Sequence, residues 1–215
     1  MRFFSQSFLY DDPWSIVSLA FFLRYPNPYA SHVISCDVIS REFTPSGSLL
    51  TTRLILKMAT LPRWAPKGII SRSESWILEE SEVDPQGKVV HCITRNLEHV
   101  KAMQVHETQT FSQVGEGKTL QTTEARIVSG FGWGLTRQIE NYGLARFRKN
   151  VQRSREGVAL ILDLIRQARQ QPMPVGSSYL SPTSLSRFTT ARRSFDHHGP
   201  ETRQFPGPDD FPHRG

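Results

Sequence analysis

RYPNPYASHVISCDVISREF, residues 24–43, decides the fold of this 215-residue chain. Proline fixes φ and biases the residue before it towards extended backbone. Tyr25 and Asn27 therefore cannot continue the helix predicted before them, and a strand that opens with His32 follows. The rigid turn sets the directions in which Arg24 and His32 point. A plain helix-to-strand connector with a solvated arginine explains the spacing too, so the turn alone assigns no function.

The segments around this turn predict an α+β plan. Residues 2–9 are typical of a strand, and Asp11-Asp12-Pro13 is a helix start signal, a capping residue followed by proline, for a helix over 14–23. Further strands are predicted over 32–43, 49–57, 73–83, 88–96, 101–112 and 118–131. Turn-forming residues at 84–87 and 115–117 suit an antiparallel meander. A long helix over 135–170 completes a short helix, about seven strands and a curved sheet that grips the last helix.

The long C-terminal helix has two distinct rows of side chains. Its apolar stripe, within about 100° of arc, contains Phe147, Val151, Val158, Ile161, Leu162 and Ile165. Arg146, Asn150 and Arg153 lie together on the flank of that stripe, at i, i+4 and i+7. An ordinary boundary row with snorkelling arginines has this pattern. So does a row of phosphate donors, because the guanidinium fork contacts phosphate oxygens bidentately.

The last 44 residues differ from the rest in composition. Residues 172–215 hold seven of the fourteen prolines and little apolar surface, so we expect a disordered tail after a domain at 1–171. The formal net charge is +6, of which +5 belongs to 1–171. A basic balance permits nucleic acid, an anionic membrane or a small anion as partner. No apolar run reaches the length of a membrane span, and the N-terminus is typical of neither a secretory signal nor a transit peptide.

Motifs for catalysis or metal binding are weak. The cysteines, Cys36 and Cys92, fit no zinc or redox spacing and are predicted to be small buried residues. GFGWG at 130–134 lacks the ending of a phosphate-binding loop and predicts a strand-to-helix turn. Glu79 and Glu80 are neighbours that point to opposite strand faces. With no nucleophile elbow and no metal-ligand spacing among the histidines, we expect no enzyme, cofactor or metal.

Lys57 and the segment after it admit two interpretations each. Lys57 shares a strand face with Arg53 and is either a solvated strand end or part of a site. Two prolines and a glycine break residues 58–70, which still carry apolar side chains. That segment is either a packed connector or a lid that touches a membrane, since Trp64 between Arg63 and Lys67 suits an anionic interface.

Several stretches, in order, resemble the PRELI/Ups family of mitochondrial intermembrane-space phospholipid carriers. Besides 24–43 they are TTRLILK at 51–57, LPRW at 61–64, ESWILEESEVDP at 74–85, TRNLEHVKAMQVHE at 94–107 and FRKNVQRSREG at 147–157. The set covers about residues 1–170 and is far more specific than any single piece. RYPNPY is most similar to the branch that carries phosphatidic acid, and the phosphatidylserine-carrying branch departs from it.

The resemblance implies a START-like, helix-grip fold around a lipid cavity and assigns roles to particular residues. The implied head-group residues are Arg24, His32, Lys57, Arg146, Asn150 and Arg153. The implied lid, in contact with membrane, contains Leu61, Pro62, Arg63, Trp64, Lys67, Ile69 and Ile70. The chain departs from the family at Thr60, where many members have a lysine.

The function implied by the resemblance is transfer of phosphatidic acid between mitochondrial membranes in the intermembrane space, in support of cardiolipin synthesis. The expected partners are phosphatidic acid, anionic mitochondrial membranes bound peripherally, and a small helical twin Cys-x9-Cys protein that forms a heterodimer. The alternatives are phosphatidylserine transfer by the same fold, or a basic nucleic-acid-binding domain. The latter would carry its basic residues in an outer stripe rather than in a cavity.

Overall fold

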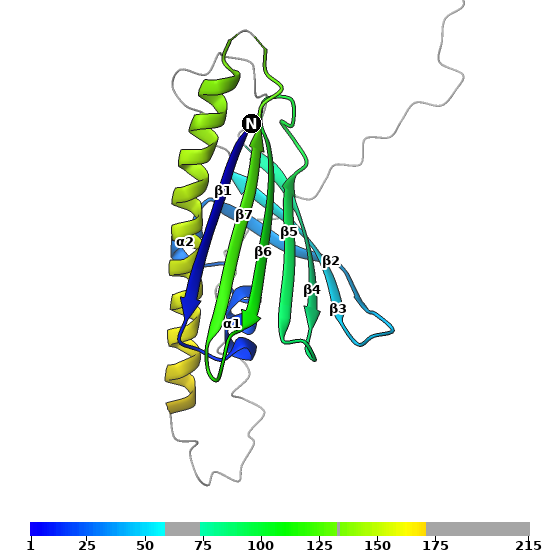
Figure 1. Cartoon of the computed structure of the whole chain (residues 1–215), viewed down its shortest axis with the longest axis vertical. Coiled ribbons are helices and arrows are strands. Elements are labelled where there is room, and N and C mark those ends of the chain that lie inside the picture. Colours follow the sequence, from blue (N-terminus) through cyan, green and yellow to red (C-terminus); the bar gives the residue numbers. More distant parts are fainter. Residues whose placement is uncertain (59–73, 133, 171–215) are drawn as a thin grey trace, which may run out of the picture. The chain divides into compact units, whose positions relative to one another are not determined.

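The structure, a computed structural model, describes residues 1–58, 74–132 and 134–170. The elements run β1 (Arg2–Tyr10), α1 (Trp14–Phe22), the 3-10 helix η1 (Pro28–Ala30), β2 (Val33–Phe43), β3 (Leu49–Met58), β4 (Glu74–Asp84), β5 (Val89–Asn96), β6 (Gln104–Gln113), β7 (Thr119–Val128) and α2 (Thr136–Gln170). Figure 1 shows α2 lying lengthwise against a curved sheet. The predicted α+β, helix-grip architecture is confirmed.

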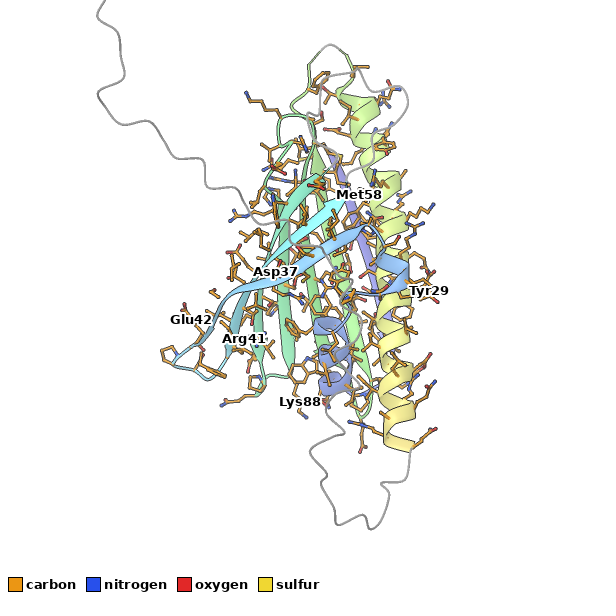
Figure 2. All side chains as sticks on the ribbon, turned by 180° about the vertical axis from the view of Figure 1, so that it is seen from behind. Tyr29, Asp37, Arg41, Glu42, Met58 and Lys88 are labelled. Carbon is orange, nitrogen blue, oxygen red and sulfur yellow. The ribbon has the colours of Figure 1, made fainter. Side chains whose placement is uncertain are left out.

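The sheet is antiparallel throughout, with strands in the order β1-β7-β6-β5-β4-β3-β2. From β2 to β7 the chain forms the predicted meander. β1 instead pairs with β7, so β1 and β2 form opposite edges of the sheet. The chain crosses between these edges through α1 and the turn at residues 23–32. That crossing places the turn on the same side of the sheet as α2 (Figure 2).

Two predicted strands and one predicted helix cap differ from the structure. β6 begins at Gln104 rather than 101, because the backbone N–H of Met103 bonds the His99 carbonyl at 2.8 Å in a turn where His99 has φ of 57°. β7 ends at Val128, and the glycines after it form the predicted turn into α2. The Asp12 cap is wrong: α1 has no side-chain cap bond, and Asp12 Oδ2 lies 2.5 Å from Arg166 Nη2.

The main core lies where α1 is packed between the sheet and α2. It contains Tyr10, Trp14, Val17, Ala20, Phe21, Val90, Cys92, Phe111, Val158 and Leu162. Complete burial of a Phe side chain contributes about 1.5–3 kcal/mol, so Phe21 and Phe111 anchor this end of the fold. The predicted stripe of α2 is confirmed: Phe147, Val151, Val158 and Leu162 are buried, and Ile161 and Ile165 pack partly buried against the core.

The proline turn is closed by the side chain of Asn27. Its Oδ1 accepts a bond from the Ala30 backbone N–H at 3.0 Å, and its Nδ2 donates to the Arg24 carbonyl. α2 approaches this side chain at Gly157, where an added Cβ would lie 2.7 Å from Asn27 Nδ2. The sequence pattern did not predict η1, which follows Asn27 directly. This contact holds the turn against the middle of α2.

Several expectations fall on residues outside the described part. Residues 59–73, which contain the whole predicted lid, and residues 171–215, which contain the predicted tail, both lie there. In the described ranges no helix has the length and apolarity to cross a bilayer. Cys92 is buried as predicted, Cys36 is half-buried, and both are free thiols.

Candidate functional site

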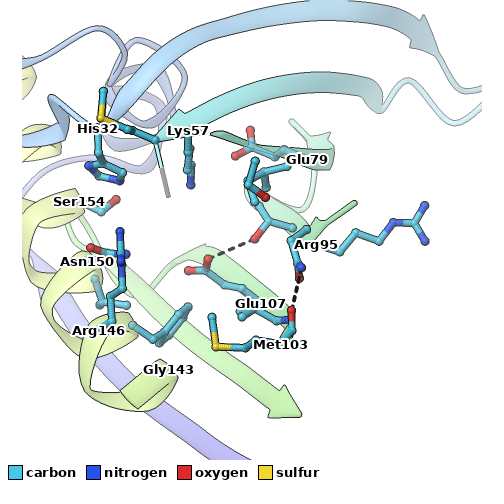
Figure 3. A pocket seen from close by; sticks show the side chains of 18 of the residues that line it. His32, Lys57, Glu79, Arg95, Met103, Glu107, Gly143, Arg146, Asn150 and Ser154 are labelled. Carbon is cyan, nitrogen blue, oxygen red and sulfur yellow. Dashed lines mark hydrogen bonds between the residues drawn. The ribbon is translucent and has the colours of Figure 1, made fainter. Parts of the chain in front are cut away.

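A cavity of about 280 Å³ lies between α2 and the inner face of the sheet. Residues from the proline turn, from β3 to β6 and from the first half of α2 line it (Figure 3). Its apolar lining includes Ile77, Met103, Val105, Ile139, Phe147 and Val151. The α1 core closes one end of the space between sheet and helix, and the cavity occupies the other.

All six residues predicted for a head-group site line this one cavity. They are Arg24, His32, Lys57, Arg146, Asn150 and Arg153. Figure 3 shows His32 and Lys57 facing Arg146 and Asn150 of α2 across the space. The helical spacing of the α2 row explains this, because its flank turns towards the cavity while Phe147 and Val151 pack below it. Whether these residues hold a ligand remains a prediction.

The cavity is cationic, with five Lys or Arg side chains against three Glu among its described lining residues. These charges are not equivalent. Arg24 is only 4% exposed, and its Nη2 lies 2.5 Å from Glu79 Oε2. In the described part of the chain, Lys57 and Arg153 form no ion pair with a carboxylate. Lys57 and Arg153 therefore contribute positive charge that no carboxylate of the described chain pairs with.

Glu79 is the centre of a buried cluster that the sequence did not reveal. Arg53 Nε donates to Glu79 Oε1 at 2.7 Å, and Arg53 Nη1 donates to the Phe22 carbonyl at 3.1 Å. Arg24 Nη1 donates to the Phe21 carbonyl at 2.6 Å, and its guanidinium lies 3.7 Å from the Phe21 ring centroid. Burial raises the pKa of Glu79, but the two guanidiniums lower it by more, so the carboxylate stays ionised. The cluster joins the end of α1 to β3 and β4.

His32 is a half-buried residue of the cavity lining with a lowered pKa. Burial lowers its pKa from 6.5 to about 4, with further lowering by Lys57, Arg146 and Arg153. These three side chains and His32 line the same cavity. Its Nδ1 is buried and has no hydrogen-bond partner among the described residues. With this pKa, His32 adds no charge near neutral pH.

A second polar group lies on the sheet side of the cavity. Glu107 accepts a bond from Thr94 Oγ1 at 3.1 Å and another from Gln109 Nε2 at 2.5 Å. Gln109 Oε1 is buried without a partner within the described residues. Nothing in the spacing of β5 and β6 singles out these residues, because inward polar positions become visible only once the strands are placed.

This arrangement can hold a phosphate and an apolar chain together. Lys57, Arg146 and Arg153 supply positive charge, Asn150 supplies an amide donor, and the apolar lining continues from them. In the described ranges no three metal-ligating side chains gather as an ion site. The lining thus combines cationic and amide groups with an apolar surface, which is the chemistry that an amphiphilic anion requires.

Comparison with known proteins gives one family for most of the chain. Residues 15–168 match the model of the PRELI-like family. Protein UPS1, mitochondrial, of Saccharomyces cerevisiae is 36% identical over 75% of this chain and 93% of its own length. The ups1 homolog of Schizosaccharomyces pombe is 40% identical over 69% of this chain and 88% of its own. Human PRELI domain-containing protein 1, mitochondrial, is 37% identical over 69% of each.

Solved structures with little sequence similarity share the fold. TTHA0849 from Thermus thermophilus superimposes with a TM-score of 0.52 at 16% identity, covering 79% of this chain and all of its own. The Zhui aromatase/cyclase of a Streptomyces species superimposes with a TM-score of 0.53 at 11% identity, over 79% and 96%. At these identities the likeness concerns architecture only.

Proposed function

The chain belongs to the PRELI-like family, and from that membership we propose that it is a lipid transfer protein of mitochondria that carries phosphatidic acid. The observation that carries the proposal is the convergence of Lys57, Arg146 and Arg153 on His32, next to an apolar lining. A phosphate monoester is the head group that best matches three cations and one amide. Its two acyl chains need the apolar part of the cavity.

Transfer by such a cavity requires no covalent chemistry. Withdrawing a lipid from a membrane exposes acyl methylenes, each worth about 0.8 kcal/mol when buried, so a carrier has to cover them. The cations offset the desolvation of the phosphate, and Asn150 orients it. The predicted lid at 61–70 would cover the chains, and Trp64 fluorescence on anionic vesicles, with the other tryptophans replaced by Phe, tests that part.

The family membership supports a proposal for the location and the partners. The relatives from Saccharomyces cerevisiae and human carry mitochondrial names, and we place this chain in the same organelle, in the intermembrane space. There it would act at anionic membranes and support cardiolipin synthesis.

The edge strand β2 exposes four large apolar side chains, Ile34, Val38, Ile39 and Phe43, which supports a protein partner of the twin Cys-x9-Cys kind. A nucleic-acid-binding role has less support, because the predicted cations line a cavity.

The proposal is tested by native mass spectrometry of the purified protein, followed by a vesicle transfer assay. We expect a co-purified phospholipid of phosphatidic acid mass, and faster transfer of phosphatidic acid than of phosphatidylserine at equal mole fraction. Faster transfer of phosphatidylserine would show that the proposed lipid is wrong and that the proposed transfer function is right. No bound lipid and no transfer, with or without a twin Cys-x9-Cys partner, would overturn the proposal.

A further inference from the structure

Arg155 occupies a second hollow, on the other edge of α2 from the cavity described above. It follows Arg153 by two positions, or about 200° around the helix, so the two side chains point in opposite directions. The hollow measures about 360 Å³ and lies between β1 and α2. Its lining includes Phe8, Leu9, Tyr10, Gln152, Glu156 and Leu162. Arg155 itself is only 9% exposed.

One edge of the Arg155 guanidinium forms no hydrogen bond with the described residues. Its Nε and Nη2 are buried and have no hydrogen-bond partner among the described residues. The guanidinium carbon, Arg155 Cζ, lies 4.8 Å from the centroid of the Phe8 ring. A guanidinium that stacks on a ring keeps its in-plane N–H groups available for hydrogen bonds. Nε and Nη2 are adjacent, and together they form the edge that binds an oxyanion through two parallel hydrogen bonds.

The carboxylates around this hollow are engaged with other groups. Asp11 pairs with Lys118 at 3.2 Å and Asp12 with Arg166 at 2.5 Å, while Glu156 accepts a bond from Gln152 at 3.2 Å. In the described part of the chain none of them forms an ion pair with Arg155. Burial lowers the pKa of the Arg155 guanidinium, and only the nearby Tyr10 opposes this. A buried cation without a counter-ion is costly unless something else pairs with it.

We propose that Arg155 is the centre of a second anion site, which binds an amphiphile with a monoanionic oxyanion, a carboxylate or a phosphodiester. The three rim carboxylates disfavour a dianion. Phe8 and Leu9 are 38% and 46% exposed beside the hollow and offer an apolar surface for the rest of the ligand. Nε and Nη2 are covered in this conformation, so binding requires a rim side chain to move. Gln152, which is exposed, is the side chain best able to do so.

The test is a titration of the full chain followed by the arginine Nε–H signals in 15N NMR, with Arg155 assigned through Arg155→Lys. The probes are acetate, octanoate and dihexanoyl phosphatidylglycerol, each compared with chloride at equal ionic strength. We expect the Arg155 signal to move downfield and saturate, at lower concentration with octanoate than with acetate. The signal of the exposed Arg148 on the same helix should follow ionic strength only.

The outcomes of the titration distinguish three roles for Arg155. Saturation by octanoate or dihexanoyl phosphatidylglycerol at lower concentration than by acetate supports the inference. Saturation by acetate as tightly as by octanoate overturns the amphiphile and leaves a site for small free anions. An Arg155 signal that never saturates overturns the inference and makes Arg155 an internal anchor on Phe8. If Arg155→Lys does not fold, through-bond correlation from the Arg155 backbone provides the assignment. The titration is repeated with the double variant Lys57→Ala/Arg153→Ala, which alters the main cavity. The Arg155 signal should saturate as in the wild type, so the Arg155 site can bind an anion even if the main cavity binds no lipid.

Discussion

Arg24 Nη2 donates to Glu79 Oε2 at 2.5 Å, and both side chains are buried. The proline turn after Arg24 and the strand that carries Glu79 are thereby joined at the edge of the cavity. The carboxylate is shared with Arg53, so the three side chains together carry one net positive charge. Arg24 thus supports the shape of the site, while Lys57 and Arg153, nearer His32, form no ion pair within the described chain.

Glu79→Gln should destabilise the fold strongly. The amide cannot balance two buried guanidiniums, and breaking a buried pair typically costs about 3–5 kcal/mol. We expect a loss of that size in the free energy of unfolding, measured by urea denaturation. Glu80→Gln is the matched control, because Glu80 is exposed and lies 3.8 Å from Arg95, a pair worth about 0–1 kcal/mol. Equal effects of the two changes would show that the cluster does not stabilise the fold.

Arg153→Glu should abolish transfer of phosphatidic acid with little change in thermal unfolding. Arg153 is exposed at the cavity, so the reversal removes an attractive charge and adds a repulsive one without disturbing the core. A charge-assisted hydrogen bond is worth about 1.5–3 kcal/mol, so lipid binding should weaken at least about tenfold. Arg148→Glu, on an exposed part of the same helix, should leave binding within about twofold. A parallel loss of folding in Arg153→Glu would indicate a structural role.

His32 should make lipid binding stronger as the pH falls. A bound phosphate opposes the effect of the three cations and raises the pKa of His32 above about 4, so binding takes up a proton between about pH 6.5 and 4. The folding stability of the unliganded protein should depend on pH in the opposite direction. The folded state binds fewer protons than the unfolded state, so stability declines as the pH falls from about 6.5 to 4. A single titrating group can change stability by at most about 1.4 kcal/mol per pH unit, and solvent screening of the half-buried His32 should keep the decline below that limit.

The measurement compares wild type with His32→Gln. Vesicle extraction and urea denaturation, each followed from pH 7 to 4, separate the two effects. The ratio of wild-type to variant affinity should rise as the pH falls. Taking this ratio cancels the titration of the lipid itself, because both proteins bind the same lipid. A constant ratio would mean that His32 does not sense the phosphate.

The strands and helices could be predicted from the sequence because they depend on local period. Helical spacing also places Arg146, Asn150 and Arg153 on one helix flank. The assignment of these residues, with Arg24, His32 and Lys57, to one site came from the resemblance to the PRELI/Ups family and not from period. Glu79 was missed because its partners are 26 and 55 residues away, and only the pairing of β3 with β4 and the path of the turn bring them together. Arg155 was missed for a similar reason, since its exposure depends on how β1 packs beside α2.

Gly157→Ala should destabilise the protein although alanine favours a helix by up to about 1 kcal/mol over glycine. The new Cβ would lie 2.7 Å from Asn27 Nδ2 and 3.1 Å from Asn27 Cγ. Asn27 cannot rotate away without losing its bonds to the Arg24 carbonyl and the Ala30 backbone N–H, each worth about 1 kcal/mol. We therefore expect a net loss of about 1–3 kcal/mol in urea denaturation, with weaker lipid extraction because the turn that carries Arg24 and His32 is displaced.

The same change in an Asn27→Ala background should be neutral or stabilising, because the overlap is gone and only the gain in helix propensity remains. A double-mutant cycle between the two positions measures this coupling directly. Coupling near zero, with Gly157→Ala tolerated alone, would show that α2 does not fix the turn. In that case the directions of Arg24 and His32 would depend on the Glu79 cluster alone, and Glu79→Gln should then lower lipid extraction more than Gly157→Ala does.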